Sequence, residues 1–282
     1  MTILDGKGLA AKLKAQTREE TARLPRRPGL AVILVGDDPA SRVYVNGKKK
    51  DCEECGFYSE EYALPEATSQ QELLELIRTL NDRDNIDGIL VQMPLPRHLL
   101  PREVIQAISP EKDVDCFHPQ NVGAMFTGSA GFLPCTPGGV MALLDEYGID
   151  PAGKQAVVLG RSNIVGKPMA VLLLDRNATV TICHSKTPNL TEICRQADIL
   201  VSAVGKTGLV TGDMVKEGAV VVDVAMNRDE NGRLCGDVDF LAVSRKASYL
   251  TPVPGGVGPM TRAMLMRNTL FSAQRRQNFE KG

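Results

Sequence analysis

The stretch Ala156-Val-Val-Leu-Gly-Arg-Ser-Asn-Ile-Val-Gly-Lys-Pro168 decides the expected fold. Its first four residues are apolar, which is typical of a buried parallel strand. Gly160 follows directly, and the apolar run from Met169 to Leu174 then predicts a helix. A strand that turns through glycine into a helix presents free backbone N–H groups and the positive end of the helix dipole, which together suit a phosphate. The stretch therefore predicts a phosphate-binding turn.

The glycine spacing of this turn departs from the usual dinucleotide-binding pattern. Ser162 stands where a second glycine is expected, and Gly166 comes one residue late. From this stretch alone, a bare structural turn explains the residues as well as a cofactor site does. The strand predicted next, from Ala178 to Cys183, supplies further evidence.

The end of that strand indicates which dinucleotide is bound. An Asp or Glu there, about 20 residues after the glycines, would hydrogen-bond the ribose hydroxyls of NAD. This chain has His184-Ser-Lys186 instead, with no carboxylate, and Arg161 lies on the glycine turn. A cation and a hydroxyl suit a ribose 2′-phosphate, which a carboxylate would repel. We therefore predict NADP as the cofactor; the alternative is that Ser185 and Lys186 only begin a solvated loop.

Length and composition narrow the class of protein. The 282 residues suffice for two domains, each with its own hydrophobic core. A formal net charge of −1 leaves no electrostatic footprint for nucleic acid or an anionic membrane. No apolar run approaches the ~20 residues of a membrane span, and residues 1–9 lack the apolar core of a signal peptide. We expect a soluble protein that contacts neither nucleic acid nor membrane.

The seven cysteines fit a reducing cytosol better than a disulfide framework, because their number is odd and the chain is long. Cys52 and Cys55 have C-x-x-C spacing, but no second pair or nearby histidine accompanies them. We interpret them as ordinary helix thiols. The sequence thus predicts a cytoplasmic protein without a metal site.

Strands and helices alternate on both sides of the glycine turn, which predicts parallel sheets covered by helices. Upstream, strands are predicted at residues 30–35, 57–63 and 86–91, and Ser69-Gln-Gln-Glu72 is a capping box that opens a helix. Downstream, strands near residues 156, 178, 199 and 219 form half or more of a doubly wound sheet. The predicted fold class is α/β, with two α/β domains, mainly parallel sheets, a Rossmann-like second domain and a cleft between them.

A proline-punctuated region from Pro94 to Pro137, with weak periodicity, precedes the second domain. A helix from Pro137 to Tyr147 is predicted to cross between the domains. The last helical pattern, from Met260 to about Arg276, carries apolar residues that need a surface to cover, so we expect it to return to the first domain. The predicted first domain is 1–138, completed by a C-terminal helix within 260–282, and the second is 139–259.

Groups able to move protons are expected in the first domain, facing the cofactor. Tyr44 and Lys48 are four residues apart on one predicted helix and share a face. An aromatic ring beside a lysine in a cleft would partly desolvate the ammonium and lower its pKa toward a value useful for proton transfer. The competing interpretation is a solvated basic stripe, because Lys48 is the first of three lysines.

Three other features have a functional and a structural interpretation. Gln92 ends an apolar strand, where it either faces a ligand or caps a loop. Asp113-Val-Asp115 places two carboxylates on alternating sides of an extended segment, and a structural ion pair with Lys112 or another cation competes with ligand binding. The loop Pro252-Val-Pro-Gly-Gly-Val-Gly-Pro259 is either a hinge or a rigid ligand-binding loop, since its prolines set its path and its glycines allow close backbone approach.

Together these features resemble the bifunctional methylenetetrahydrofolate dehydrogenase/methenyltetrahydrofolate cyclohydrolase family. The resemblance covers nearly the whole chain, and its most specific part is the segment from Pro252 to Thr261. The other matching segments are Tyr44 to Lys48, Val91 to Pro96, Lys112 to Asp115, Pro134 to Pro137, Gly160 to Ser162, Val165-Gly166 and Cys183 to Ser185.

The resemblance implies that the enzyme oxidises 5,10-methylenetetrahydrofolate with NADP and then hydrolyses the methenyl product to 10-formyltetrahydrofolate in the same cleft. It implies a catalytic, folate-binding first domain, an NADP-binding second domain and a homodimer. It also implies that the folates, with or without a polyglutamate tail, are the partners. The family's general acid/base lysine falls on Lys48, its pterin-stacking tyrosine on Tyr44, the glutamine that tunes the lysine on Gln92, and the pterin-binding aspartate on Asp115.

The same resemblance implies two sets of binding residues. The 2′-phosphate contacts fall on Arg161 and Ser185. The folate set is Tyr44, Lys48, Val91, Gln92, Met93, Asp115, Pro254, Gly255, Gly256, Gly258 and Pro259, and the cofactor set is Gly160, Arg161, Ser162, Gly166, Ser185 and Met226.

Two positions depart from the family pattern. Cys116 follows Asp115 where the family usually has glycine, and Ala225-Met226 stands where it usually has Gly-Ile. A side chain at 116 restricts φ, so we expect a shift of the loop that carries Asp115. The second change lies near the expected nicotinamide end and would alter cofactor affinity.

Two other functions compete with this one. A different NADP oxidoreductase, acting on a hydroxy acid, would ignore folates, and the absence of an obvious His–carboxylate pair argues against it. A folate- or nucleotide-binding protein without catalysis would bind ligand without turnover. The set Lys48, Gln92 and Asp115 argues against that interpretation.

Overall fold

The structure is a computed structural model that describes residues 1–279, apart from the side chains of residues 39, 40, 43, 44, 278 and 279. The chain forms two compact units. We call them the six-stranded unit, Met1–Ala10 and Thr136–Thr261, and the three-stranded unit, Ala11–Cys135 and Arg262 onward.

The three-stranded unit contains a parallel sheet in the order β3-β2-β4, at the positions where strands were predicted. The central strand β2 is buried along its whole length, which is why its sequence is a continuous apolar run. The strands are β2 (Gly29–Val35), β3 (Tyr58–Leu64) and β4 (Gly88–Val91).

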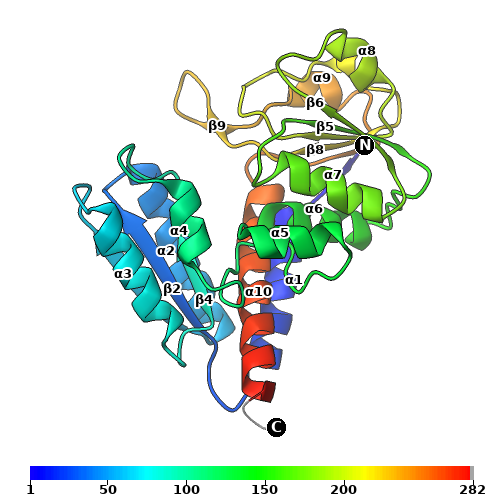
Figure 1. Ribbon diagram of the computed structural model, residues 1–282. Helices are drawn as coiled ribbons and strands as arrows, with labels where there is room; N and C mark the ends of the chain where they lie inside the picture. Colours follow the sequence, from blue (N-terminus) through cyan, green and yellow to red (C-terminus); the bar gives the residue numbers. More distant parts are fainter. Residues whose placement is uncertain (280–282) are drawn as a thin grey trace. The chain divides into compact units, whose positions relative to one another are not determined.

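Helices cover both faces of this sheet, and the two-residue period of β2 divides its side chains between them. Leu30, Val32 and Leu34 pack toward helix α2 (Pro39–Cys55) and α10 (Val257–Phe279). The alternate residues of β2 pack toward α3 (Gln70–Asn81) and α4. Figure 1 shows α2 and α3 on opposite sides of the sheet. The remaining helices with residues in this unit are α1 (Gly6–Thr21), α4 (Pro101–Ala107) and α5 (Pro119–Phe126).

Local signals in the sequence account for where these helices begin and end. Ser69 and Glu72 form the predicted capping box at the start of α3. Gly56 ends α2 with a left-handed φ of 77°, a conformation that costs glycine little. Burial raises the pKa values of Cys52 and Cys55 on α2 to about 12, so both thiols stay protonated, as expected for ordinary helix thiols.

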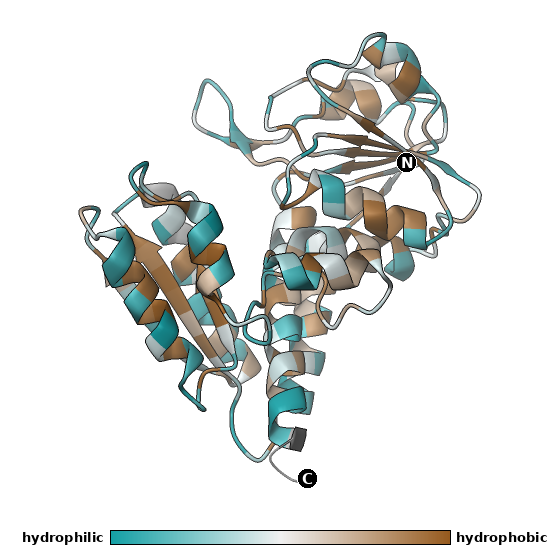
Figure 2. Cartoon of the chain, in the orientation of Figure 1, coloured by the Kyte–Doolittle hydropathy of each residue, from teal (hydrophilic) through white to brown (hydrophobic). Residues whose placement is uncertain are grey.

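The six-stranded unit contains a parallel sheet in the order β1-β11-β8-β7-β5-β6. Figure 2 shows its strands as strongly hydrophobic, as expected for a sheet covered on both faces. The strands are β1 (Thr2–Ile3), β5 (Gln155–Leu159), β6 (Thr179–Cys183), β7 (Ile199–Ser202), β8 (Val220–Asp223) and β11 (Tyr249–Leu250). A separate two-stranded antiparallel hairpin follows β8 in the chain. Its strands are β9 (Asn227–Arg228) and β10 (Leu234–Cys235). The helices are α6 (Cys135–Glu146), α7 (Gly166–Asp175), α8 (Leu190–Arg195) and α9 (Phe240–Val243), with a 3-10 turn at Gly212–Met214.

The predicted bounds of the first domain differ from the structure at the N-terminus. Residues 1–10 belong to the six-stranded unit, because β1 adds to its sheet through the pairs Thr2↔Tyr249 and Ile3↔Leu250. A two-residue strand has no periodicity that a sequence pattern could reveal. Of the predicted C-terminal segment 260–282, residues 280–282 lie outside the part of the chain that the structure describes. The predicted cleft between the domains stays a prediction.

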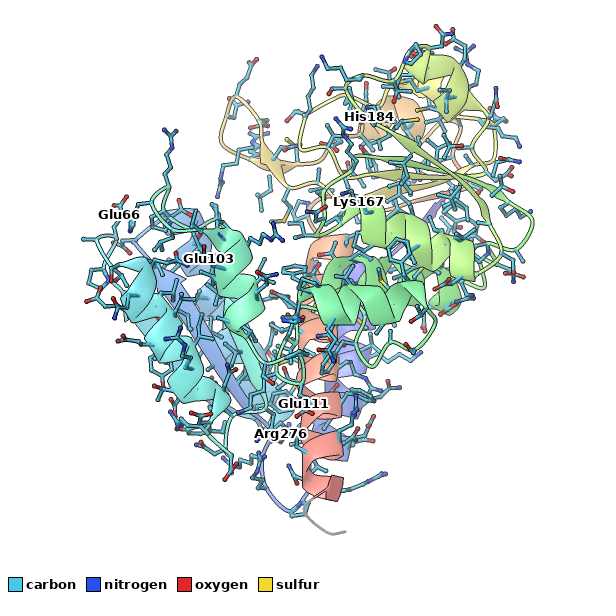
Figure 3. All side chains as sticks on the ribbon, in the orientation of Figure 1. Glu66, Glu103, Glu111, Lys167, His184 and Arg276 are labelled. Atoms are coloured by element: carbon cyan, nitrogen blue, oxygen red, sulfur yellow. The ribbon has the colours of Figure 1, made fainter. Side chains whose placement is uncertain are left out.

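Asp87 ties the long helix α10 to the three-stranded sheet. Its fully buried carboxylate accepts hydrogen bonds from the Arg26 guanidinium at 2.6 and 2.8 Å, from the Gly29 amide at 2.9 Å and from Arg276 Nη1 of α10 at 3.1 Å. Figure 3 labels Arg276 on this helix. Asp84 also approaches Arg276, at 3.8 Å, but it is 93% exposed.

We predict that Asp87→Ala lowers the free energy of unfolding by about 3 kcal/mol, because it leaves two partly buried guanidinium groups without their shared partner. Asp84→Ala removes a carboxylate from the same arginine at the surface and should cost less than about 0.5 kcal/mol. Urea unfolding followed by circular dichroism measures both. Equal losses in the two variants would contradict this account.

Candidate active site

The carboxyl edge of the three-stranded sheet brings Lys48 and Gln92 together. Lys48 lies on α2, whose Val45 and Cys52 face the core, and this orientation turns Lys48 inward as well. Gln92 follows β4 directly. Lys48 Nζ donates a hydrogen bond to Gln92 Oε1 at 2.7 Å, and only 9% of the lysine is exposed. The alternative of a solvated basic stripe is therefore wrong for Lys48, whereas Lys49 and Lys50 are exposed.

Gln92 is held so that its carbonyl oxygen faces the amine. Its Nε2 donates to the backbone carbonyl of Met93 at 2.7 Å, which leaves Oε1 for Lys48. The backbone N–H of Gln92 donates to the Ile33 carbonyl at 2.8 Å and so continues the ladder of β4 with β2. Val91 is the last, buried residue of β4. The amide thus bonds the lysine through Oε1 and the following loop through Nε2.

Burial lowers the pKa of the Lys48 ammonium, because desolvation penalises its charged form. The nearby Asp115 carboxylate opposes this effect, and the guanidinium of Arg262 adds to it. The net effect is a pKa below that of an ordinary lysine, so a larger fraction of the amine is neutral near neutral pH. A neutral amine in reach of a ligand can accept a proton, which is the chemistry expected of a general base.

Asp115 is the acidic member of the same cluster and is half-buried. Desolvation raises the pKa of its carboxyl, and the positive charge of Lys48 partly offsets the increase. The thiol of Cys135 lies within hydrogen-bonding reach of this carboxylate. Asn268, buried on α10, donates to the carbonyls of Val114 and Leu133, both at 2.8 Å, and so fixes the segment that precedes Asp115.

The neighbouring position 116 keeps a glycine-like backbone although it is cysteine. Cys116 has a φ of 61°, in the left-handed region, and its buried thiol lies 3.5 Å from the Phe132 carbonyl oxygen. A side chain at residue 116 was expected to restrict φ. Cys116 nevertheless adopts the left-handed conformation, which costs a non-glycine residue about 1 kcal/mol.

The ion pair with Lys112 considered for Asp113 or Asp115 does not form, whereas Asp115 lies near another cation, Lys48. Lys112 Nζ donates instead to three backbone carbonyls, those of Leu80, Asn81 and Arg83, at 2.6–3.0 Å. Asp113 accepts from the amides of residues 117 and 118 and from Asn121. Sequence spacing could not show these contacts, because they join loop residues to the end of α3 and to α5, and no periodic pattern relates such positions.

Tyr44 lies in α2, one helical turn before Lys48, as predicted. Its side chain lies outside the described residues, so its orientation stays a prediction.

In the six-stranded unit, Gly160 follows β5 at the point where the strand order reverses, between β5 and β7. Such a switch point is where open α/β sheets bind ligands. Gly160 has a φ of 110°, and a Cβ there would lie 2.4 Å from the Ala203 carbonyl oxygen. A Cβ at Gly166 would lie 2.2 Å from the Gly160 carbonyl oxygen. Both glycines are therefore required by a tight turn, as predicted for Gly160.

The residues between these glycines form an exposed cradle of N–H groups. Ser162 Oγ accepts hydrogen bonds from the amides of Val165 and Gly166, both at 3.2 Å, and thereby shapes the start of α7. Within the described part of the chain, the N–H groups of residues 161–164 donate no hydrogen bond. Free amides before a helix N-terminus suit a phosphate, so this turn fits a dinucleotide.

Arg161 and Ser185 extend from neighbouring strands. Leu159 of β5 pairs with Cys183 of β6, and the Gly160 amide donates to the Cys183 carbonyl at 2.9 Å. Arg161 and Ser185 are both exposed and lie within two residues of this pair. Figure 3 labels His184 beside the end of β6 and Lys167 on the first turn of α7. The edge therefore presents cations and a hydroxyl, and residues 184–187 contain no carboxylate.

The predicted loop 252–259 also lies in the six-stranded unit. Gly255 has a φ of 113°, its carbonyl accepts from the Lys7 amide at 2.9 Å, and a Cβ at Gly6 would lie 1.8 Å from the Gly256 carbonyl oxygen. A Cβ at Gly258 would lie 3.4 Å from Met226 Sδ. The structure thus places Gly258 beside Met226.

Two buried carboxylates in this unit escaped sequence analysis. Asp237 is fully buried and accepts from Ser202 Oγ, from the amides of residues 204–206 and from Asn227 Nδ2, at 2.6–3.3 Å. Asp223 accepts from the amides of residues 225, 237 and 238, and burial raises its pKa to about 6. They hold the loops that follow β7 and β8. The run Gly-Asp-Val-Asp at residues 236–239 could have drawn attention to Asp237, but it has no periodicity that indicates a buried carboxylate.

Comparisons with known proteins agree with this geometry. Residues 4–115 match the model of the tetrahydrofolate dehydrogenase/cyclohydrolase catalytic domain, and residues 134–277 match that of the NAD(P)-binding domain of the same family. The chain belongs to the tetrahydrofolate dehydrogenase/cyclohydrolase family. These matches confirm the family that the sequence resembles and the presence of an NAD(P)-binding domain. They also confirm the two-domain α/β fold class with mainly parallel sheets.

Individual relatives cover almost the whole chain. The bifunctional protein FolD of Ruminiclostridium cellulolyticum is 60% identical over 270 residues, which is 95% of each chain. The crystal structure of the bifunctional FolD methylenetetrahydrofolate dehydrogenase/cyclohydrolase from Campylobacter jejuni has a TM-score of 0.96 at 55% identity and covers 98% of this chain and 99% of its own. The Trypanosoma brucei enzyme, solved with NADP and an inhibitor, has a TM-score of 0.94 at 41% identity, with 98% of each chain covered. A shikimate dehydrogenase from Thermus thermophilus, at 16% identity and a TM-score of 0.54, shares the fold alone.

Two features are absent from the described residues. In residues 1–279, no helix is long and apolar enough to cross a membrane. Over the same range, no group of three or more His, Cys, Asp or Glu side chains is placed to hold a metal ion.

We predict that Gly160→Ala lowers the free energy of unfolding by about 2–4 kcal/mol, because its Cβ would collide with a backbone carbonyl at a φ unfavourable for alanine. Gly153→Ala is the matched control, since Gly153 also has a positive φ, 71°, but open space around it. Its cost should be about 1 kcal/mol. Thermal and urea unfolding compare the two, and similar losses would show that the turn has room for a side chain.

Proposed function

We propose that this chain oxidises 5,10-methylenetetrahydrofolate with NADP and hydrolyses the methenyl product to 10-formyltetrahydrofolate, with Lys48 as the general acid/base. The observation that supports it best is the buried amine of Lys48, bonded at 2.7 Å to Gln92 with Asp115 nearby. The family match and the bifunctional FolD relatives support the pair of activities. A hydroxy-acid oxidoreductase would have no evident use for this set of residues.

In the oxidation, NADP would supply the hydride acceptor for the carbon that bridges N5 and N10 of the folate. The remaining cation is shared between the two nitrogens, so the protein's task is to align the bridge carbon and to exclude water. We assign pterin binding to Asp115, whose oxygens accept hydrogen bonds from ring nitrogens, and to stacking by Tyr44. Val91, Met93 and the loop residues Pro254, Gly255, Gly256, Gly258 and Pro259 complete the proposed folate set.

In the hydrolysis, water adds to the methenyl carbon, and the neutral amine of Lys48 takes its proton. The C–N5 bond then breaks as N5 receives the proton from the Lys48 ammonium. The hydroxyl of the adduct loses its own proton to water and becomes the C=O of the formyl group, which stays on N10. Gln92 keeps the amine oriented through its Oε1, which accepts a hydrogen bond from either form of the amine. One residue thus serves as base and then as acid, which requires a pKa below that of an ordinary lysine.

For the cofactor, we assign the pyrophosphate to the amides between Gly160 and Gly166, with Ser162 shaping the turn. Arg161 and Ser185 are assigned to the ribose 2′-phosphate, and Met226 to the nicotinamide side. The exposed N–H groups of residues 161–164 support the first assignment. The exposed cation and hydroxyl beside paired strand ends support the second.

We also propose that the protein is a cytoplasmic homodimer that accepts folates with or without a polyglutamate tail. All seven cysteines are free thiols, which fits a reducing compartment. The edge strand β6 exposes Ile182 to 39%, and Leu174 on the adjoining α7 is 61% exposed. An unpaired strand edge with apolar side chains favours pairing with a second copy.

We predict that Lys48→Ala lowers the rate of methenyltetrahydrofolate hydrolysis at least about 100-fold, because it removes the amine that is proposed to relay the proton. NADP binding, followed by fluorescence titration, should stay within twofold. Lys49→Ala, the adjacent exposed lysine, is the control and should retain full activity. Normal hydrolysis by Lys48→Ala would refute the assignment.

We predict that Arg161→Ala raises the KM for NADP about tenfold or more and changes that for NAD less than twofold, because only NADP carries the 2′-phosphate. Lys154→Ala removes a cation before β5, at the opposite edge of the sheet, and should change neither value. Steady-state dehydrogenase kinetics with each cofactor provide the comparison. Equal effects of Arg161→Ala on both cofactors would rule out the 2′-phosphate role.

We predict that Ile182→Lys converts the dimer to a monomer, since a charge on the strand edge opposes pairing. Light scattering after size exclusion measures the mass. Leu241→Lys, at an apolar side chain that is 75% exposed on α9, should leave the dimer intact. A monomeric wild-type protein would contradict the proposal.

A further inference from the structure

A buried carboxylate lies one helical turn after Lys48, outside the set of residues assigned above. Asp51, on α2, is 2% exposed. Its Oδ1 lies 2.7 Å from Lys14 Nζ, and its Oδ2 lies 3.3 Å from Arg262 Nη1. Within the described residues, Oδ2 accepts no hydrogen bond of good geometry, so Arg262 is the cation that compensates this oxygen.

The backbone of α2 makes room for the Arg262 guanidinium. A Cβ at Gly47, the residue before Lys48, would lie 2.2 Å from Arg262 Nη1 and 3.3 Å from its Cζ. Glycine in the middle of a helix costs about 1 kcal/mol relative to alanine, so its presence here calls for a reason. In the structure, the absence of a side chain at residue 47 leaves space for the guanidinium.

The position of this cation bears on the charge of Lys48. A second positive charge disfavours the protonated form of an amine, and the guanidinium is always charged. Arg262 is one of the groups that lower the pKa of Lys48, after burial. Three groups packed around the amine raise the pKa of Lys48: Asp115, Cys135 and Cys52. Its hydrogen-bond partner Gln92 is neutral.

We propose that Arg262, anchored by Asp51 and accommodated by Gly47, is a positioning residue that keeps a positive charge beside Lys48 and so favours its neutral amine. The step needs no co-reactant, because the ammonium releases its proton to water. The inference deepens the proposed function, because the effect of Arg262 on hydrolysis rests on that function. Its effect on the titration of Lys48 does not depend on that function.

Arg262→Gln tests the charge, and Arg262→Lys restores it. The rate at which an amine-reactive reagent modifies Lys48, read by peptide mass spectrometry from pH 6 to 11, gives the titration midpoint. We expect Arg262→Gln to raise the midpoint by about 0.5–1 unit, because the cation is lost and Asp51 is left less compensated. Near neutral pH this lowers the neutral fraction, and with it methenyltetrahydrofolate hydrolysis, by about 3–10-fold.

Arg262→Lys should bring the midpoint back to within about 0.3 unit of wild type. Gly47→Ala, whose Cβ displaces the guanidinium, should raise it as Arg262→Gln does. Arg267→Gln is the matched control, because Arg267 is on the same helix but pairs with Glu20, and it should leave the midpoint unchanged. Circular dichroism and thermal unfolding establish that each variant is folded.

Two results would overturn the proposal: a midpoint in Arg262→Gln equal to that of wild type, or an equal shift in Arg262→Lys, which would show a packing role. A shifted midpoint without a matching loss of hydrolysis would support the role of Arg262. That outcome would refute instead the use of Lys48 as the base in hydrolysis, so the two failures are distinguishable.

Discussion

The hydrogen bond from Lys48 Nζ to Gln92 Oε1 is the interaction on which the proposed active-site chemistry depends. An amine removed from water tends to lose its proton, and a neutral amine needs a fixed acceptor to stay oriented. The sheet meets both needs. Its central strand β2 is followed by the helix that carries the lysine, and its neighbour β4 ends at the glutamine, so two residues 44 positions apart meet at one edge.

The same topological rule shapes the other unit. There, the strand order reverses between β5 and β7, and the tight turn at Gly160, directly after β5, leaves amides without partners before α7. Asp237 and Asp223 hold the adjoining loops through buried hydrogen bonds to backbone amides. The sheet edge of the three-stranded unit therefore presents a desolvated amine, and that of the six-stranded unit presents a turn with free backbone amides. The division agrees with the catalytic and NAD(P)-binding family models matched by the two regions.

Much of the fold could be predicted from the sequence, because continuous apolar strands, the Ser69 capping box and Gly56 each have a local physical signature. Elements without such a signature were missed: the two-residue β1, and the short helices α4 and α5 in a proline-rich region. In the site, Lys48, Gln92 and Asp115 were predictable from position and resemblance. The partners of Lys112 and the Arg262–Asp51 pair were not, since these contacts join loops and helices distant in sequence.

The central claim is that Lys48 is a buried, readily deprotonated amine, and its own titration tests this most directly. Heteronuclear NMR of the lysine side chains, with Lys48→Arg used for assignment, would follow the Lys48 signal across the alkaline range. The account predicts a midpoint below the ordinary lysine value of about 10.4, as burial requires. A midpoint at or above that value would mean that the amine is solvated or fully ion-paired, and it would contradict the account.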